Sequence, residues 1–367
     1  MMFDFFDINL QIDKLLEEAR HDRITLFGAG GFARAVYSAL QKLGVQVHTF
    51  VVSGPSAGMI ETVPVVSLNE LDDALCLLPI WLAVFNRNAA SDLVTLARAC
   101  KARGIDRPRL PQDYFEAIEQ QMGWRFWLTD RRQYAGNLPQ IEEAFRMLRD
   151  DESRQQFMEA LRFRLGASID QAPQPSNTAQ YFPDEVNGLV SSRREIVFVD
   201  GGAYDGDTIA QAASRLPLAT AYAFEPDLAN FSRLAHNVKA LNFPVVCFPC
   251  GLSNVTEWLS FSSQSGEASA VTPDGNTRVQ CVRLDECLVG QRVDYIKLDV
   301  EGHELAALEG ARDIIDRYRP LLAIAAYHRW DDLWRIPKFL QRYAPDYRIT
   351  YRAHESNTFD SVFYAAC

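Results

Sequence analysis

The hydrophobic positions of this chain form short, wholly apolar runs that alternate with segments of helical spacing. A strand covered on both faces reads as a continuous apolar run, so each run predicts a buried parallel strand. Alternation of such strands with helices predicts a doubly wound α/β sheet. In the second half of the chain the predicted strands cover residues 196–199, 219–224, 245–248, 294–299 and 321–326.

Period-two alternation adds strands of another kind. Residues 258–261 and 278–283 predict an inserted hairpin, and residues 347–351 and 359–365 predict a final antiparallel pair. The second half of the chain therefore predicts a sheet whose last strand runs against the others.

A similar pattern opens the chain after a short amphipathic helix predicted over residues 1–20. An apolar run at residues 24–27 leads into Gly28-Ala29-Gly30-Gly31 and then into a helix. The next strand, residues 45–52, should end in the acid that holds an NAD ribose. It ends in Val52-Ser53-Gly54 instead. We interpret this region as a Rossmann-like accessory domain through which the protein could form a homo-oligomer. The alternative is an NAD-dependent oxidoreductase that uses this glycine turn.

These patterns predict three parts. Residues 1–107 form the accessory domain, residues 108–194 a helical linker or cap, and residues 195–367 the second α/β domain. The middle part carries helical spacing at 114–121 and 140–165. A polar, proline-containing stretch at 168–182 predicts a loop over the pocket of the following domain.

Composition narrows the class of protein. The 367 residues are 48% apolar and 23% charged, which is typical of globular proteins, and the net charge of −11 argues against a nucleic-acid partner. The sequence predicts no signal peptide and no membrane span. The seven cysteines lack CxxC spacing and predict reduced thiols. A cytoplasmic protein is expected.

The candidate chemistry gathers around a second glycine turn, Asp200-Gly201-Gly202-Ala203-Tyr204-Asp205-Gly206-Asp207-Thr208. Asp200 can accept from a ligand's amino group, and Glu225, at the end of the next strand, can accept from both ribose hydroxyls. A carboxylate just before the glycines would repel a pyrophosphate. The charges therefore favour the cationic sulfonium of S-adenosylmethionine. Asp207 and Thr208 are residue types suited to a helix N-cap.

The stretch from residue 195 to 367 resembles the FkbM-type methyltransferases. The matching motifs are 199–208, Phe224-Glu225-Pro226, Gly251-Leu252-Ser253, 283–286 and 296–304 with its Asp-Val-Glu-Gly core. One departure is the run 201–205, where the family often has a Gly-Ala-Asn-like sequence. The resemblance implies a class I methyltransferase fold and S-adenosylmethionine-dependent O-methylation of a sugar or secondary-metabolite hydroxyl. The cofactor-binding residues we expect are Asp200, Gly201, Gly202, Ala203, Tyr204, Asp207, Thr208, Glu225, Pro226, Gly251, Leu252 and Asp299.

Methyl transfer to oxygen needs an aligned hydroxyl and often a base. Asp299 is the first candidate, as base or as an orienting group near the sulfonium. Glu301 is the second, or else a buried carboxylate bonded to the backbone of its turn. His328 is the third, or else a partner of Asp331 or Asp332. The sequence leaves these alternatives open.

Asp299, Glu301 and His303 alternate, so an extended backbone would place them together as ligands for a divalent metal. Gly302 is expected to break that path, so no metal ligand is assigned and a required metal is not favoured. His303 is expected to start a helix and face solvent. Lys297 lies within a strand and is expected to snorkel, to pair with a carboxylate or to act in catalysis.

A third hypothesis is a sensor that binds a nucleotide-sugar or cofactor without turnover. The candidates Asp299 and Glu301 argue against it. No motif identifies the methyl acceptor.

Overall fold

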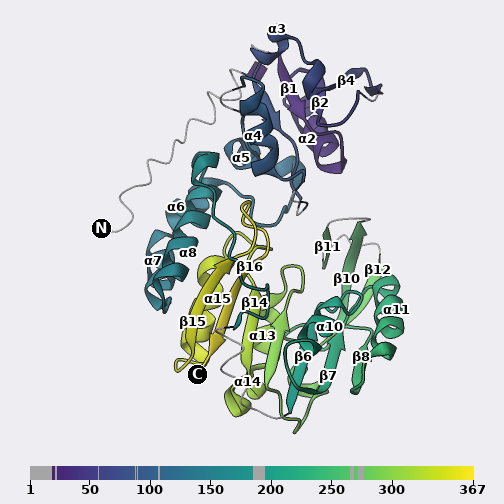
Figure 1. Cartoon of the computed structure of the whole chain (residues 1–367), viewed down its shortest axis with the longest axis vertical. Coiled ribbons are helices and arrows are strands. Elements are labelled where there is room, and N and C mark those ends of the chain that lie inside the picture. The colour runs from purple at the N-terminus through teal and green to yellow at the C-terminus, as the bar shows by residue number, and fades with distance from the viewer. Residues whose placement is uncertain are drawn as a thin grey trace. The chain divides into compact units, whose positions relative to one another are not determined.

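The computed structural model describes residues 19–20, 23–56, 58–86, 88, 90–105, 108–184, 195–264, 268–271 and 277–367 (Figure 1). The helix predicted over residues 1–20 lies outside this set, apart from its last two residues. The chain folds into two compact units. One comprises Met1–Glu142, Gln156–Pro175 and Glu355–Phe359, and the other Glu143–Gln155, Ser176–His354 and Asp360–Cys367.

The first unit is built on a five-stranded sheet of order β3-β4-β2-β1-β5. All neighbouring pairs are parallel except β3 with β4. The predicted strand, glycine turn and helix are present as β1 and α2. The strands are β1 (Ile24–Phe27), β2 (Val47–Val52), β3 (Met59–Ile60), β4 (Val63–Ser67) and β5 (Ile80–Leu82).

Helices and short 3-10 turns complete this unit. Two of the boundaries between the units fall inside helices, one in α7 and one in α8. The helical spacing at 140–165 gives two helices rather than one, because the chain turns between Met147 and Asp151. The elements are α2 (Gly31–Lys42), η1 (Leu68–Glu70), α3 (Asp73–Cys76), α4 (Leu93–Ala102), α5 (Pro111–Met122), α6 (Arg131–Gly136), α7 (Leu138–Met147), α8 (Asp151–Arg164) and η2 (Ile169–Gln171).

The second unit is built on a seven-stranded sheet of order β15-β16-β14-β13-β6-β7-β8. The apolar runs of the sequence form its parallel strands, and β14 is buried along its whole length. The predicted final pair is present, with β16 antiparallel to both of its neighbours. The strands are β6 (Ile196–Gly201), β7 (Leu218–Phe224), β8 (Val245–Phe248), β13 (Tyr295–Leu298), β14 (Leu321–Ala325), β15 (Arg348–Ala353) and β16 (Ser361–Ala366).

The chain leaves β6 toward β7 and β8, then returns to β13 on the other side of β6. Because parallel crossovers are right-handed, this reversal directs successive helices to opposite faces of the sheet. The carboxyl ends of β6 and β13 flank the point of reversal, which is where ligands bind in such sheets. The predicted doubly wound fold with an antiparallel last strand is confirmed.

A smaller sheet of order β11-β10-β12-β9 is inserted between β8 and β13. The predicted hairpin is its centre, since β10 pairs with β12 in antiparallel register. Its strands are β9 (Gly251–Leu252), β10 (Glu257–Gln264), β11 (Ala268–Val271) and β12 (Thr277–Val282).

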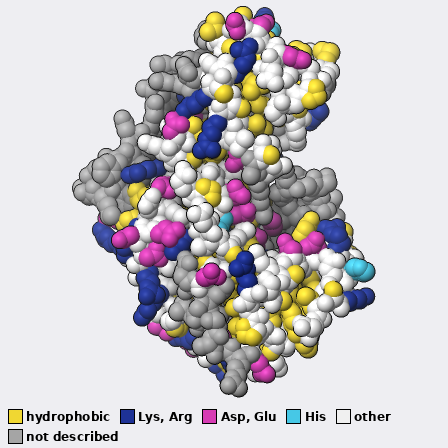
Figure 2. Space-filling model, viewed as in Figure 1, with side chains coloured by type: hydrophobic (Ala, Val, Ile, Leu, Met, Phe, Trp, Pro, Cys, Tyr) yellow, Lys and Arg dark blue, Asp and Glu magenta, His cyan; other side chains and the backbone are white. Residues whose placement is uncertain are grey.

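The helices of the second unit follow the predicted order, with the segment before Pro320 split into α13 and α14. They are α10 (Asp207–Ala213), α11 (Leu228–Asn237), η3 (Val238–Ala240), α12 (Leu284–Cys287), α13 (Glu304–Gly310), α14 (Arg312–Tyr318) and α15 (Asp332–Tyr343). No helix in the described parts of the chain is long and apolar enough to cross a bilayer. On the face shown in Figure 2, acidic and basic side chains are interspersed rather than gathered into one field.

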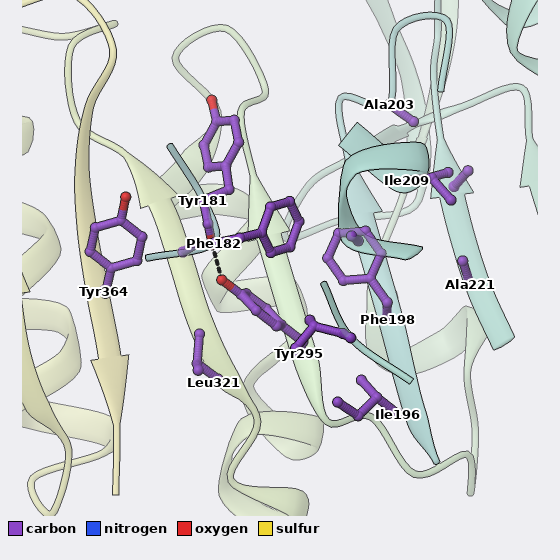
Figure 3. Close-up of a cluster of buried hydrophobic side chains, with 14 of the residues drawn as sticks. Tyr181, Phe182, Ile196, Phe198, Ala203, Ile209, Ala221, Tyr295, Leu321 and Tyr364 are labelled. Atoms are coloured by element: carbon purple, nitrogen blue, oxygen red, sulfur yellow. Dashed lines mark hydrogen bonds between the residues drawn. The ribbon is translucent and has the colours of Figure 1, made fainter. Parts of the chain in front are cut away.

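A buried cluster joins β6, β13 and the loop before β6 (Figure 3). The ring of Tyr295 meets those of Phe182 and Phe198 edge to face, and the two Phe rings are tilted relative to each other, with all centroids 5.6–5.8 Å apart. The Tyr295 hydroxyl donates to the Tyr181 carbonyl, which anchors the loop residue Tyr181 at the edge of the cluster. The loop predicted at 168–182 thus reaches the central strands through its last residues.

Candidate active site

The candidate site begins at Gly202, directly after β6. Its φ is +76°, and a Cβ at this position would lie 1.9 Å from the carbonyl oxygen of Asp299. Such an approach and such a dihedral both require glycine. Gly202 therefore allows the backbone after β6 to lie against the backbone after β13, at the reversal point of the sheet.

A buried ion pair lies beneath this contact. Register places Lys297 of β13 beside Asp200 of β6, and Lys297 Nζ lies 2.9 Å from Asp200 Oδ1. The same ammonium donates to the Gly202 carbonyl at 2.7 Å. Burial raises the pKa of Asp200 to about 6, although Lys297 lowers it. Of the roles considered for Lys297, pairing with a carboxylate is the one observed. The ammonium also supports the glycine turn through its hydrogen bond to the Gly202 carbonyl.

Glu225, at the end of β7, is held by two backbone N–H groups. Its Oε2 accepts from the Tyr204 N–H at 2.9 Å and its Oε1 from the Asp227 N–H at 2.8 Å. Burial raises the pKa of Glu225 to about 7, and these N–H groups oppose the rise. Each oxygen keeps a further acceptor position, so the carboxylate is fixed and still able to bind hydroxyls.

The other residues of the turn have different surroundings. Ala203 and Thr208 are buried, whereas the Tyr204 side chain is 51% exposed. The N-cap of α10 is Gly206, with φ +92°, rather than Asp207 or Thr208. Asp207 instead accepts from the Thr208 N–H at 2.7 Å.

The remaining expected cofactor residues lie next to this turn. A Cβ on Gly201 would be 2.9 Å from Leu252 Cδ1, and a Cβ on Gly251 would be 3.8 Å from Pro226 Cβ. Segments 25 to 50 residues apart in sequence thus converge on one corner, since β6, β7 and β9 all end there.

Asp299 follows β13 and is fixed by two phenols. Tyr181 donates to its Oδ2 at 2.8 Å, and Tyr327 donates to its Oδ1 at 3.1 Å. Burial, followed by the nearby Asp299 carboxylate, raises the pKa of Tyr181 well above its ordinary value. Tyr181 therefore stays protonated and acts as a hydrogen-bond donor to Asp299.

His328, after β14, is wholly buried among three carboxylates. Its Nδ1 lies 2.8 Å from Glu304 Oε1, and its Nε2 lies 3.3 Å from Asp299 Oδ1 and from Glu301 Oε2. Burial alone would lower the pKa of His328, but Glu304, Glu301 and Asp299 raise it to about 9. The imidazole is therefore a cation at neutral pH. Asp332, one of the partners expected as an alternative, also interacts with His328: burial raises the pKa of Asp332, and the charge on His328 opposes that rise.

The sequence left two roles open for Glu301, a catalytic base or a buried carboxylate bonded to the backbone of its turn. The second role belongs to Glu304. Glu304 accepts from the Val300 N–H at 2.9 Å, so Glu304 is the buried carboxylate bonded to the turn. The Glu301 side chain is 31% exposed, and its backbone has φ +52°. Strained backbone of this kind is concentrated at functional sites.

The backbone turns at Glu301 and Gly302, between the residues that the sequence offered as metal ligands. Positive φ at both residues ends the extended path, as expected, and His303 becomes the N-cap of α13. His303 is only partly exposed, and burial lowers its pKa. Asp299, Glu304 and His328 do bring one ligand atom each within 4.8 Å of one another.

Four residues of this site were not identified from sequence. Tyr327 and Arg329 adjoin His328 at a strand end, and Glu304 begins the helix after the Asp-Val-Glu-Gly motif, so position alone could have indicated them. Tyr181 is 118 residues from Asp299, and no local pattern connects the two.

Comparison with known proteins finds similarity to methyltransferases within the second unit. Residues 200–350 match the methyltransferase FkbM domain family. A 98-residue stretch is 32% identical to the hexuronic acid methyltransferase AglP of Haloferax volcanii, covering 25% of this chain and 41% of that relative.

A crystal structure of methyltransferase FkbM from Methylobacillus flagellatus KT superposes with a TM-score of 0.71 at 23% identity. The match covers 96% of this chain and 92% of that one, so the fold is shared over both units. Neither the oxidoreductase nor the sensor hypothesis gains support from these matches. Residues 200–350 of this chain, which hold the second glycine turn and the strands on both sides of it, are thus similar to the methyltransferase FkbM domain.

Proposed function

We propose that this protein binds S-adenosylmethionine and transfers its methyl group to a hydroxyl of a small molecule, a sugar or a related metabolite. The observation that carries the proposal is the pair of fixed acids, Glu225 and Asp299, on either side of the glycine turn. The family match and the hexuronic acid methyltransferase relative support it.

The corner suits the cofactor in shape and charge. Glu225 would accept from the ribose hydroxyls, and Pro226, Gly251 and Leu252 would line the base. The turn from Gly201 to Tyr204 brings backbone rather than side chains to the ligand. Asp200 is wholly buried against Lys297. We therefore propose that it stabilises the glycine turn through this ion pair and contributes to the electrostatic potential of the site, without contacting the cofactor.

The cluster beyond β13 suits a sulfonium. Three carboxyl groups surround one imidazolium, so the site carries excess negative charge that favours a cationic cofactor. This electrostatic complementarity is the physical reason to place the methyl donor beside Asp299.

The surroundings of the three candidates suggest a division of roles. Asp299 already accepts from two phenols and is suited to orientation, whereas Glu301 is the most exposed carboxyl group of the cluster. We propose that the Glu301 carboxylate takes the acceptor's hydroxyl proton as the oxygen attacks the methyl carbon and the carbon–sulfur bond breaks. His328 would stabilise the carboxylate beforehand. The products are the methyl ether and S-adenosylhomocysteine.

The reaction as proposed needs no metal. We propose instead that His328 offsets the negative charge of Asp299 and Glu304, because both carboxylates lie against its ring and raise its pKa to about 9. Methyl transfer should therefore survive treatment with EDTA, and loss of activity restored by Mg²⁺ would overturn this point.

The direct test is calorimetric titration with S-adenosylmethionine and NAD, followed by a methyl-transfer assay over a panel of sugars. Binding of S-adenosylmethionine alone, and loss of that binding in the double variant Asp200→Ala/Glu225→Ala, are expected. Tight binding that survives both substitutions would overturn the site. Transfer to nitrogen or carboxyl acceptors only would overturn the reaction class.

A further inference from the structure

Arg329 lies over the turn that carries Glu301. It follows His328 beyond β14, and its Nε donates to the Gly302 carbonyl at 2.7 Å. A Cβ on Gly302 would be 3.3 Å from this Nε, so the absence of a side chain at Gly302 lets the guanidinium rest on the turn. Arg329 is thus fixed beside the proposed base by one of its five N–H groups.

The neighbouring acids are all engaged elsewhere. Glu304 pairs with His328, and Asp331 pairs with Arg335 at 3.0 Å. Asp332 Oδ2 accepts from the backbone N–H of Arg329, not from its guanidinium. Within the described residues Arg329 forms no ion pair.

A half-buried guanidinium in an acidic site is expected to pair with a carboxylate, because its partial desolvation is otherwise uncompensated. Arg329 rests on the turn that carries Glu301 and forms no ion pair with any acid of the described residues. Its terminal nitrogens, Nη1 and Nη2, form the planar fork that binds carboxylates bidentately.

We propose that Arg329 binds a carboxylate of the methyl acceptor, so that the acceptor is an acidic small molecule. This inference rests on the proposed function, since it names the class of substrate for that site. An acidic acceptor would be repelled by Asp299 and Glu301 unless a cation offset them. Arg329 supplies that cation and orients the acceptor relative to Glu301.

A matched pair of probes tests the proposal by binding, without turnover. Methyl glucuronoside and methyl glucoside differ in a carboxylate and are titrated with and without S-adenosylhomocysteine. We expect the glucuronoside to bind about 10- to 100-fold more tightly, the range for hydrogen bonds to a charged group. Equal binding of the two by the unmodified protein, or equally tight binding of glucose 6-phosphate, would overturn the proposal.

Substitutions at Arg329 test whether this residue causes the preference for the carboxylate. Arg329→Gln should remove the preference and leave weak glucoside binding unchanged, and Arg329→Lys should retain part of it. The control is Arg335→Gln, an exposed arginine of α15, which should keep the full preference. Arg329→Lys keeps the test valid if the glutamine variant does not fold. A preference that persists in either folded variant at its full size would contradict the assignment.

Cofactor titrations separate this inference from the proposed function. Arg329→Gln should bind S-adenosylmethionine as tightly as the unmodified protein does. Loss of cofactor affinity with the acceptor preference intact would assign Arg329 to the cofactor and overturn the inference. A clear carboxylate preference in a protein that transfers no methyl group would refute the proposed function only.

Discussion

In both units a glycine at the reversal point of the sheet lets the backbone after one strand lie against the backbone after the neighbouring strand. Gly28 directly follows β1 and Gly202 directly follows β6. A Cβ on Gly28 would lie 2.5 Å from the carbonyl oxygen of Ala83, just as a Cβ on Gly202 would meet that of Asp299. Ala83 and Asp299 are each the first residue after the neighbouring strand. The two corners thus share this close approach of one backbone to another, with φ of +133° at Gly28 and +76° at Gly202.

The side chains at corresponding strand ends differ between the two units. The residue after the second strand is Ser53 in the first unit and Glu225 in the second. The third residue after the strand beyond the reversal is Phe85 in the first and Glu301 in the second. Phe85 packs against the ring of Trp127 with centroids 5.1 Å apart, so the first corner is filled by aromatic core. A glycine corner shows where a ligand can bind, and the acids at the strand ends decide whether one does.

The largest effect is expected at the glycines. Gly202→Ala should abolish cofactor binding and destabilise the second unit by about 3 kcal/mol or more, because of the clash and the positive φ. Gly28→Ala should destabilise the first unit and leave S-adenosylmethionine affinity unchanged. Calorimetry and thermal unfolding measure both.

The control for the glycine pair is Gly30→Ala, since a Cβ there meets no atom within 4 Å. This variant should match the unmodified protein. Loss of cofactor binding in Gly28→Ala would show that the two corners are coupled and would break the comparison.

The next effect concerns rate. Glu301→Gln should lower the methyl-transfer rate about 10²- to 10³-fold, the contribution of a general base, and change cofactor affinity little. Single-turnover transfer and calorimetry separate the two quantities. Glu309→Gln, on the exposed side of α13, is the matched control. A near-normal rate for Glu301→Gln would leave Asp299 or His328 as the base.

Exchanging the strand-end residues sharpens the comparison further. Glu225→Ser should weaken S-adenosylmethionine binding about 10- to 100-fold, because two hydroxyl acceptors are lost. The reciprocal variant Ser53→Glu should bind no NAD, because Phe85 still fills the first corner and Ala83 still offers no polar side chain there. NAD binding by Ser53→Glu in a calorimetric titration would mean that the acid alone distinguishes the two corners.

The smallest effect is a pH dependence confined to the second corner. Burial raises the pKa of Glu225 to about 7, so the carboxyl group ionises between pH 6 and 8. The ionised form accepts from both ribose hydroxyls, and affinity for S-adenosylmethionine should therefore rise severalfold as pH increases over this range. Glu225→Gln should lose this rise, and an identical pH profile in that variant would contradict the assignment.

Much of this architecture could be predicted from local sequence. Apolar runs located the strands of both sheets, and alternation located the hairpin of β10 with β12 and the final pair of β15 with β16. Glycines at strand ends marked both corners, and acids at strand ends marked the second one, because carboxyl ends of parallel strands meet at one edge of a sheet. Helix breaks inside continuous helical spacing, such as the one between α7 and α8, were not predictable in this way.

The sequence by itself determined which residue types stand at the strand ends, since periodicity and spacing are local properties. Only the tertiary structure decided which of them meet. Register placed Lys297 beside Asp200, the order of strands placed His328 among Glu304, Glu301 and Asp299, and a loop far away in sequence supplied Tyr181. These contacts depend on strand order and loop path, which no short window of sequence encodes.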